Sequence, residues 1–329
     1  MKPFAYERAA DVAGAVAAVT ASPGAAFLGG GTNLVDYLKI GTLRHDLLVD
    51  VTGLPLDRVE DLPDGGLRIG AGVRNSDLAA HPAVRERYPV LSQAVLAGAS
   101  GQLRNLATTG GNLLQRTRCL YFQDVSKPCN KREPGTGCPA RDGEHRDLAV
   151  LGWSEACVAT YPGDMAVALA ALDATVRVTG PAGDRVIPLE ELHRLPGDEP
   201  QRDSTLAHGE LITAVDLPPL PLARRSSYGK ARDRASFAFA LASVAAALEV
   251  RDGLVADLRL AFGSVAHKPW RAHHAEEALR GAPATPESYA RALDAELEQA
   301  RPLRDNGFKI LLLRRMATAA LDELAGGAA

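Results

Sequence analysis

The stretch FLGGGTNL, residues 27–34, places three consecutive glycines directly after a short apolar run. Glycine has no Cβ, so consecutive glycines let backbone N–H groups converge on an anion without steric obstruction. Thr32 and Asn33 add side-chain donors. The pattern suits a pyrophosphate, although it matches neither the G-x-G-x-x-G dinucleotide fingerprint nor the Walker sequence. Taken alone, a simple glycine turn is an equally good interpretation.

A second stretch, NLATTGGNLL at residues 105–114, repeats this chemistry. It again combines hydroxyl groups, paired glycines and an asparagine after an apolar run, at Thr108, Thr109, Gly110, Gly111 and Asn112. Two such loops would clamp the two ends of a long phosphorylated cofactor. The alternative is that the paired glycines only relieve crowding at a strand bend.

Length and composition limit the number of domains and the classes of partner that this chain can have. The chain has 329 residues, a net charge of −3 and 46% hydrophobic residues. Such a length predicts about two domains, and the near-neutral charge gives no electrostatic reason to expect nucleic acid as a partner. No apolar run is long enough to cross a bilayer, and the N-terminus lacks the apolar core of a signal peptide. We therefore expect a cytoplasmic protein.

Periodicity and turn signals predict the order of elements in the first two thirds of the chain. We expect a helix over about 9–22, strands over 46–54 and 66–73, and one or two helices over 81–99. A helix followed by a strand is expected over 161–180, and a further strand begins at 210. The prolines between Pro218 and Pro221 mark the best domain boundary.

Beyond this boundary, Asp252-Gly253 separates two strand-like runs, 236–250 and 254–265, which predicts a β-hairpin. Helices are expected over 271–281, 286–300 and 306–324, with Asn306 as the cap of the last. The whole pattern predicts an α+β architecture in two pieces.

All four cysteines fall in one polar, turn-rich region, about 116–160, with the spacing C-x9-C-x8-C-x18-C. Four thiolates are what a [4Fe–4S] cluster needs. Structural zinc sites usually contain tight C-x2–4-C pairs, which this spacing lacks, and disulfides are disfavoured in a reducing cytosol. The alternative is four unrelated thiols. A polar loop of this length also needs a staple to stay ordered, and a cluster would supply one.

These motifs together resemble a known family. FLGGGTNLVDYLK, RNLATTGGN, YPGDMAVALAALDA and ELITAVDLP, with LRLAFGSVAHKPWRAHHAEEALRG and ARPLRDN further on, are similar to the FAD-binding medium subunit of the molybdenum hydroxylases, the xanthine dehydrogenase and aldehyde oxidoreductase family. The resemblance implies a vanillyl-alcohol-oxidase-type FAD-binding domain of two α+β subdomains over 1–220. It also implies a small α/β C-terminal flavoprotein domain over 224–325.

The resemblance also implies the cofactor-binding residues. Those of the two glycine loops hold the FAD pyrophosphate and ribityl chain: Leu28, Gly29, Gly30, Gly31, Thr32, Asn33 and Leu34 in the first, and Thr108, Thr109, Gly110, Gly111 and Asn112 in the second. Asp164 resembles the acidic residue that contacts the flavin, and it also suits a carboxylate at a helix N-terminus. Lys230 resembles a lysine near the flavin ring, where a cation stabilises the anionic reduced flavin. The alternative is that Lys230 is an ordinary solvated lysine on the surface.

The insert RCLYFQDVSKPCNKREPGTGCPA, residues 118–140, resembles that of the bacterial periplasmic-type aldehyde oxidoreductases, whose flavin subunit carries an additional [4Fe–4S] cluster. The resemblance assigns Cys119, Cys129, Cys138 and Cys157 as ligands. A related insert in 4-hydroxybenzoyl-CoA reductase has a different cysteine spacing. The neighbouring cations Lys127, Lys131 and Arg132 either offset the negative charge of the cluster or are simply solvated.

The expected function is that of an electron-transfer FAD subunit in a heterotrimeric molybdenum hydroxylase. A large partner would carry molybdopterin and bind an aldehyde, a small partner would carry two [2Fe–2S] clusters, and the flavin would pass electrons to an external acceptor. No acid–base pair for substrate chemistry is evident in this chain. The alternatives are a stand-alone flavin reductase or oxidase, a 4-hydroxybenzoyl-CoA reductase-like flavin subunit, and a zinc-stabilised scaffold. Export on a partner's signal would place the complex in the periplasm.

Overall fold

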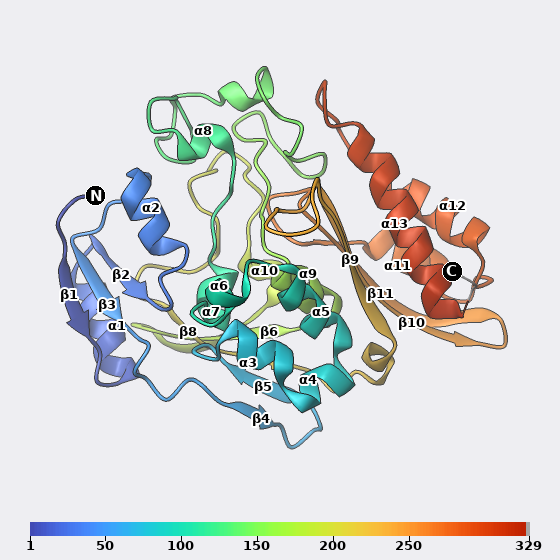
Figure 1. The fold of residues 1–329 in the computed structure, drawn as a ribbon, viewed down its shortest axis with the longest axis horizontal. Coiled ribbons are helices and arrows are strands. Elements are labelled where there is room, and N and C mark those ends of the chain that lie inside the picture. Colours follow the sequence, from blue (N-terminus) through green and yellow to red (C-terminus); the bar gives the residue numbers. More distant parts are fainter. Residues whose placement is uncertain (327–329) are drawn as a thin grey trace.

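The structure is a computed structural model that describes residues 1–326, and within them the chain forms three sheets (Figure 1). The first sheet is parallel, in the order β1-β3-β2. Helix α1, Val12–Ala21, connects its outer strands and begins after Asp11, whose carboxylate accepts a hydrogen bond from the Gly14 N–H at 2.7 Å. The strands are β1 Ala5–Arg8, β2 Ala25–Leu28 and β3 Leu47–Asp50.

The second sheet is antiparallel, in the order β4-β5-β8-β6-β7. Strands β5 and β8 are neighbours although the second glycine stretch and the cysteine region both lie between them in the sequence. The region predicted as one or two helices forms two, α4 and α5. The elements are β4 Val59–Asp61, β5 Leu67–Gly70, α3 Asn75–Ala80, α4 Pro82–Arg87, α5 Pro89–Ala97, β6 Thr175–Gly180, β7 Gly183–Pro188 and β8 Leu211–Leu217.

The third sheet contains the predicted hairpin, which is confirmed. Strands β10, Ala242–Arg251, and β11, Leu254–Gly263, pair antiparallel across Asp252 and Gly253. Both turn residues have positive φ, 51° and 75°, as a type I′ turn requires. Strands β9, Ser226–Ala231, and β12, Trp270–Arg271, complete the order β12-β11-β10-β9.

Helices cover both faces of this third sheet (Figure 1). Val244, Ala246 and Leu248 of β10 share a core with α11 His273–Leu279, α12 Pro286–Leu297 and α13 Phe308–Ala325. Ala245 points to the opposite core, which includes α5 and the fully buried helix α9, Met165–Ala171. Burial on both faces explains why the sequence of β10 is a continuous run of small and apolar residues.

The remaining elements are short connections: α2 Leu34–Ile40, α6 Gly101–Arg104, α7 Thr109–Leu113, α8 Leu120–Gln123, α10 Leu189–Leu192 and the 3-10 turns Pro139–Arg141 and Pro221–Arg224. The expected α+β fold is confirmed. Across residues 1–326, no helix is long and apolar enough to span a membrane.

The prediction that Asn306 caps the last helix is wrong. Helix α13 begins at Phe308, and Gly307 occupies the cap position. The Asn306 side chain is fully buried and turned away from the helix: its Oδ1 accepts from the Leu303 N–H at 2.7 Å, and its Nδ2 donates to the Ala149 carbonyl at 3.1 Å. Local sequence predicts that the Asn306 side chain caps the helix, but in the structure it is hydrogen-bonded to the backbone at the end of the cysteine region instead.

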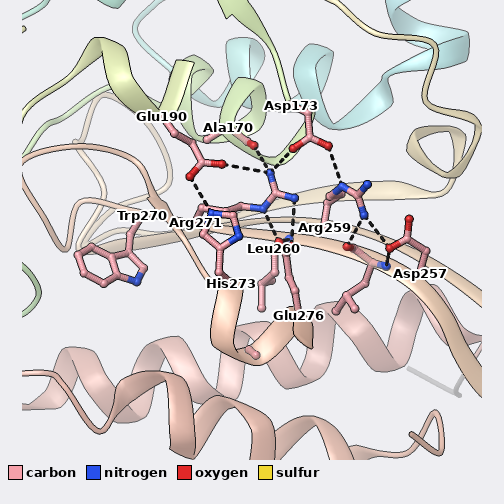
Figure 2. A network of polar contacts seen from close by, with 12 residues as sticks. Ala170, Asp173, Glu190, Asp257, Arg259, Leu260, Trp270, Arg271, His273 and Glu276 are labelled. Carbon is pink, nitrogen blue, oxygen red and sulfur yellow. Dashed lines mark hydrogen bonds and ion pairs between the residues drawn. The ribbon is translucent and has the colours of Figure 1, made fainter. Parts of the chain in front are cut away.

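A buried polar network joins the third sheet to the rest of the chain (Figure 2). The Arg271 side chain is 3% exposed, and its guanidinium donates to the Ala170 carbonyl at 2.5 Å and to Asp173 at 2.7 Å. On its other side it pairs with the buried carboxylate of Glu276, which also accepts from the Leu260 N–H at 2.7 Å. The network therefore satisfies the charges that this junction buries.

Candidate functional site

The two glycine loops lie directly against each other. A Cβ on Gly30 would come within 1.9 Å of the Leu106 carbonyl oxygen, and one on Gly29 within 2.8 Å of the Thr108 hydroxyl. Gly31 has a φ of 73°. These positions therefore need glycine for close backbone approach and for a left-handed conformation. The Thr108 hydroxyl accepts from the Gly111 N–H at 3.2 Å and so caps α7.

Two cavities border this pair of loops. The larger, about 210 Å³, takes in the predicted residues Thr32, Asn33, Asn112, Asp164 and Lys230. The smaller, about 80 Å³, includes in its lining Gly29, Thr108, Gly110 and Gly111. The structure therefore brings nine of the predicted residues to two cavities on one pair of loops.

The other predicted residues of the loops, Leu28, Gly30, Gly31, Leu34 and Thr109, do not line these two cavities in the described part of the chain. Thr109 is fully buried, and both its N–H and its hydroxyl donate to the Val73 carbonyl, at 2.9 and 3.1 Å. Its place is within the framework that holds the second loop.

Asp164 and Lys230 form a buried ion pair at the larger cavity. The Lys230 ammonium lies 2.8 Å from Oδ2 of Asp164, and the two side chains are 5% and 8% exposed. The Tyr228 hydroxyl donates to the other carboxylate oxygen at 2.7 Å. Burial, and then the charge of Asp164, raise the pKa of Tyr228 well above its ordinary value, so it remains a donor. Asp164 stands at the N-terminus of α9 but makes no capping hydrogen bond with its side chain.

Several residues of the larger cavity were not predicted from the sequence. Asn75 is buried there, and its Oδ1 has no hydrogen-bond partner within the protein. Arg104 and Arg118 add positive charge, and Phe237 and Phe239 add aromatic rings that are 61% and 50% exposed. Nothing in the local sequence distinguishes these residues from ordinary loop residues. An unpaired buried acceptor and two cations suit a polar, anionic ligand.

The four cysteines line a cavity of their own. Cys119 directly precedes α8, Cys138 precedes the 3-10 turn, and Cys157 lies where the region returns to the main fold. All four thiols are free, and together they line one small cavity that also includes Phe122 and Lys131. Residues up to 38 positions apart in the sequence are thus brought to one place.

The state of these thiols depends on their surroundings. Burial raises the pKa of Cys119 to about 11. The interaction between the Cys138 and Cys157 thiols lowers the pKa of Cys138 and raises the pKa of Cys157 well above its ordinary value. Within residues 1–326, no three His, Cys, Asp or Glu side chains are grouped so that they could hold one metal ion. The cysteines therefore surround a space without meeting at a single point.

Comparison with known proteins agrees with this arrangement. Residues 2–220 match the family described as the FAD binding domain in molybdopterin dehydrogenase, and residues 226–324 match the CO dehydrogenase flavoprotein C-terminal domain. Reconstituted CO dehydrogenase from Oligotropha carboxidovorans has the same fold, with a TM-score of 0.77 and 21% identity over 99% of both chains.

Curated relatives share the whole length of the chain. It is 52% identical to the aldehyde oxidoreductase FAD-binding subunit PaoB of Escherichia coli (strain K12) over 98% of both chains. It is 26% identical to the putative xanthine dehydrogenase FAD-binding subunit XdhB of the same organism, over 98% of this chain and 96% of that one. The chain therefore belongs to the molybdenum hydroxylase family, as one of its FAD-binding medium subunits.

Proposed function

We propose that this chain is the electron-transferring FAD subunit of a heterotrimeric aldehyde oxidoreductase-type molybdenum hydroxylase. The observation that carries the proposal is the pair of packed glycine loops whose residues line two cavities, in a chain 52% identical to an aldehyde oxidoreductase FAD-binding subunit over 98% of both chains. A large partner would hold molybdopterin and bind the aldehyde, a small partner would hold two [2Fe–2S] clusters, and an external acceptor would take the electrons. We further propose that the complex is cytoplasmic, unless a partner's signal exports it.

The FAD would lie across the two loops. Backbone N–H groups of the first loop and the polar side chains of Thr32, Asn33 and Asn112 would hold its pyrophosphate and ribityl chain. Two cavities bordered by the same pair of loops suit a cofactor with two bulky ends. When bound, FAD supplies the exchange between two-electron and one-electron transfer.

Asp164 and Lys230 would stand beside the flavin, as the sequence predicts for each of them. Because the ammonium of Lys230 and the carboxylate of Asp164 lie 2.8 Å apart, a flavin in the cavity would meet both charges together. Lys230 would favour extra negative charge in the cavity, and Asp164 would moderate this effect. Tyr228 keeps the carboxylate oriented.

The four cysteines would hold a [4Fe–4S] cluster. Cys119, Cys129, Cys138 and Cys157 line one cavity, as four ligands of a single cluster must. In a cubane each thiolate binds a different iron atom, so the four sulfur atoms need not converge on one point, whereas a zinc ion requires this. When bound, the cluster supplies a one-electron redox centre.

Two domains would carry these sites. We propose a FAD-binding domain over 1–220, with the iron–sulfur insert over about 116–160, and a C-terminal domain over 224–325. The boundary falls between β8, which ends at Leu217, and β9, which begins at Ser226.

Aldehyde oxidation by the complex, compared with aldehyde oxidation by the isolated chain, tests this function. We expect the complex purified with both partners to oxidise an aldehyde, and its FAD to be reduced on addition of that aldehyde under anaerobic conditions. The isolated chain, loaded with FAD, should leave the aldehyde untouched. Oxidation of the aldehyde by the isolated chain would identify it as a stand-alone oxidoreductase instead.

A further inference from the structure

Two lysines stand at equal sequence distance from Cys129 but lie in different surroundings. Lys127 is exposed to solvent. The Lys131 side chain is 3% exposed and lines the cavity of the four thiols. Of the described residues other than cysteine that line this cavity, Lys131 alone has a charged side chain. The neighbouring Arg132 donates instead to the backbone carbonyls of Tyr121 and Phe122, at 2.5 and 2.6 Å.

The Lys131 ammonium is held in place from outside the insert. It donates to the Pro200 carbonyl at 2.7 Å and to Oδ1 of Asp203 at 2.5 Å. The second oxygen of Asp203 accepts from the Arg116 guanidinium. Burial alone would raise the pKa of Asp203, but the charges of Lys131 and Arg116 outweigh it and hold that pKa below its ordinary value. The Lys131 ammonium is therefore fixed beside the cavity that its side chain lines, bonded to the ionised carboxylate of Asp203.

We propose that the Lys131–Asp203 pair sets the reduction potential of the iron–sulfur cluster bound by the four cysteines. The inference rests on the cluster that we propose above. One-electron reduction adds one negative charge to a cluster, and charges interact more strongly where solvent is excluded. Cluster potentials respond to net charge and to solvent exposure. Lys131 stabilises the reduced cluster and so raises its potential, while Asp203 acts in the opposite direction from behind it.

Four variants separate this role from a merely structural one. Lys131→Met removes the buried charge and should lower the equilibrium constant for reduction at least tenfold, which is about 59 mV for a one-electron couple. Asp203→Asn keeps the shape and an acceptor oxygen, and it should shift the potential upward. Lys131→Arg keeps the charge and should stay near wild type. Lys127→Met removes the same charge from an exposed site, where solvent and salt screen it, and should change the constant by less than about threefold.

The experiment is a redox titration followed by electron paramagnetic resonance on the anaerobically purified complex, after iron and sulfide analysis. We expect Lys131→Met and Asp203→Asn to shift the midpoint in opposite directions. Equal potentials for Lys131→Met and Lys127→Met would overturn this inference, and so would shifts of the same sign for Lys131→Met and Asp203→Asn. Either result would leave the proposed cluster standing. If Lys131→Met loses its iron, Asp203→Asn must still raise the potential and Lys131→Arg must preserve it. A wild-type chain that holds no iron after reconstitution would overturn the proposed cluster as well.

Discussion

Asp164 and Lys230 form a buried contact that bears on stability and, in the proposed function, on the cofactor. Each side chain would be costly to bury alone, and each neutralises the other at 2.8 Å. The sequence predicts both residues near a flavin but not their pairing, since they are 66 positions apart. Because the pair is neutral overall, we expect its effect on the flavin to depend on which of the two charges lies nearer the ring.

The pair leads to a first prediction. Asp164→Asn leaves the Lys230 ammonium buried without its counter-charge, so we expect the free energy of unfolding to fall by about 3–5 kcal/mol. Lys230→Met should have a comparable effect. The double variant should lose less than the sum of the two, because neither charge is stranded. Urea unfolding of all four chains in excess FAD measures this, and additive losses would show that the pair is not coupled.

Lys309 leads to a prediction about pH. Its ammonium is buried against the carbonyls of Asp147, Leu148 and Ser264 at 2.8–3.0 Å, and desolvation lowers its pKa from 10.5 to about 7. Between these two values the unfolded chain binds more protons than the folded chain, so stability must rise with pH in that interval. Below pH 7 both states are protonated and the contribution is constant.

Lys309→Met should remove this rise. We expect the difference in free energy of unfolding between wild type and variant to change in favour of wild type as the pH increases from 7 to 9. Because the other titrating groups are common to both chains, the difference isolates Lys309. A difference that stays constant over this interval would mean that the lysine keeps an ordinary pKa when folded.

At the scale of elements, the contact between the two glycine loops is the feature to test. In Gly30→Ala the new methyl group would meet a backbone carbonyl, which cannot rotate away as a side chain can. The loops must separate, and we expect the FAD dissociation constant to rise at least about tenfold. Gly101→Ala is the matched control, since a Cβ there meets no atom within 4 Å. Fluorescence titration of the apoprotein with FAD measures both, and equal affinities would refute the role of the close approach.

Local patterns predicted the elements well where local chemistry decides them. Asp252-Gly253 specifies its hairpin because both residues accept positive φ. Asn306 was misassigned because its buried amide bonds to residues that lie far away in the sequence. Arg118 and Asn75 at the larger cavity were missed for the same reason: only the tertiary fold brings them there. The proximity of the four cysteines followed from resemblance and spacing, whereas the burial of Lys131 beside them required the structure.

At the scale of the whole molecule, helix α9 connects the larger cavity to the junction with the third sheet. Asp164 at its start pairs with Lys230 of β9, and Asp173 just beyond its end pairs with Arg259 and Arg271 of β11 and β12. The helix is fully buried along its length. The third sheet is thus bound to the N-terminal part of the chain at both ends of one helix.

Arg271 leads to the prediction for this junction. Arg271→Met leaves the buried Glu276 carboxylate without its main partner, so we expect a loss of about 3–5 kcal/mol in the free energy of unfolding. The matched control is Arg251→Met, because Arg251 pairs with Glu249 at an exposed site where such pairs contribute about 1 kcal/mol or less. Equal losses for the two variants in thermal or urea unfolding would contradict a stabilising role for the network.

The most direct test of the central claim is the metal and flavin content of the wild-type chain. The protein is purified anaerobically, and FAD, iron, sulfide and zinc are measured per chain, with each cysteine then replaced by serine in turn. We predict about one FAD, with about four iron and four sulfide for one cubane, and loss of iron but not of FAD in the serine variants. A chain that contains FAD but takes up no iron even after reconstitution would contradict the cluster. A chain that contains zinc and no flavin would contradict the account as a whole.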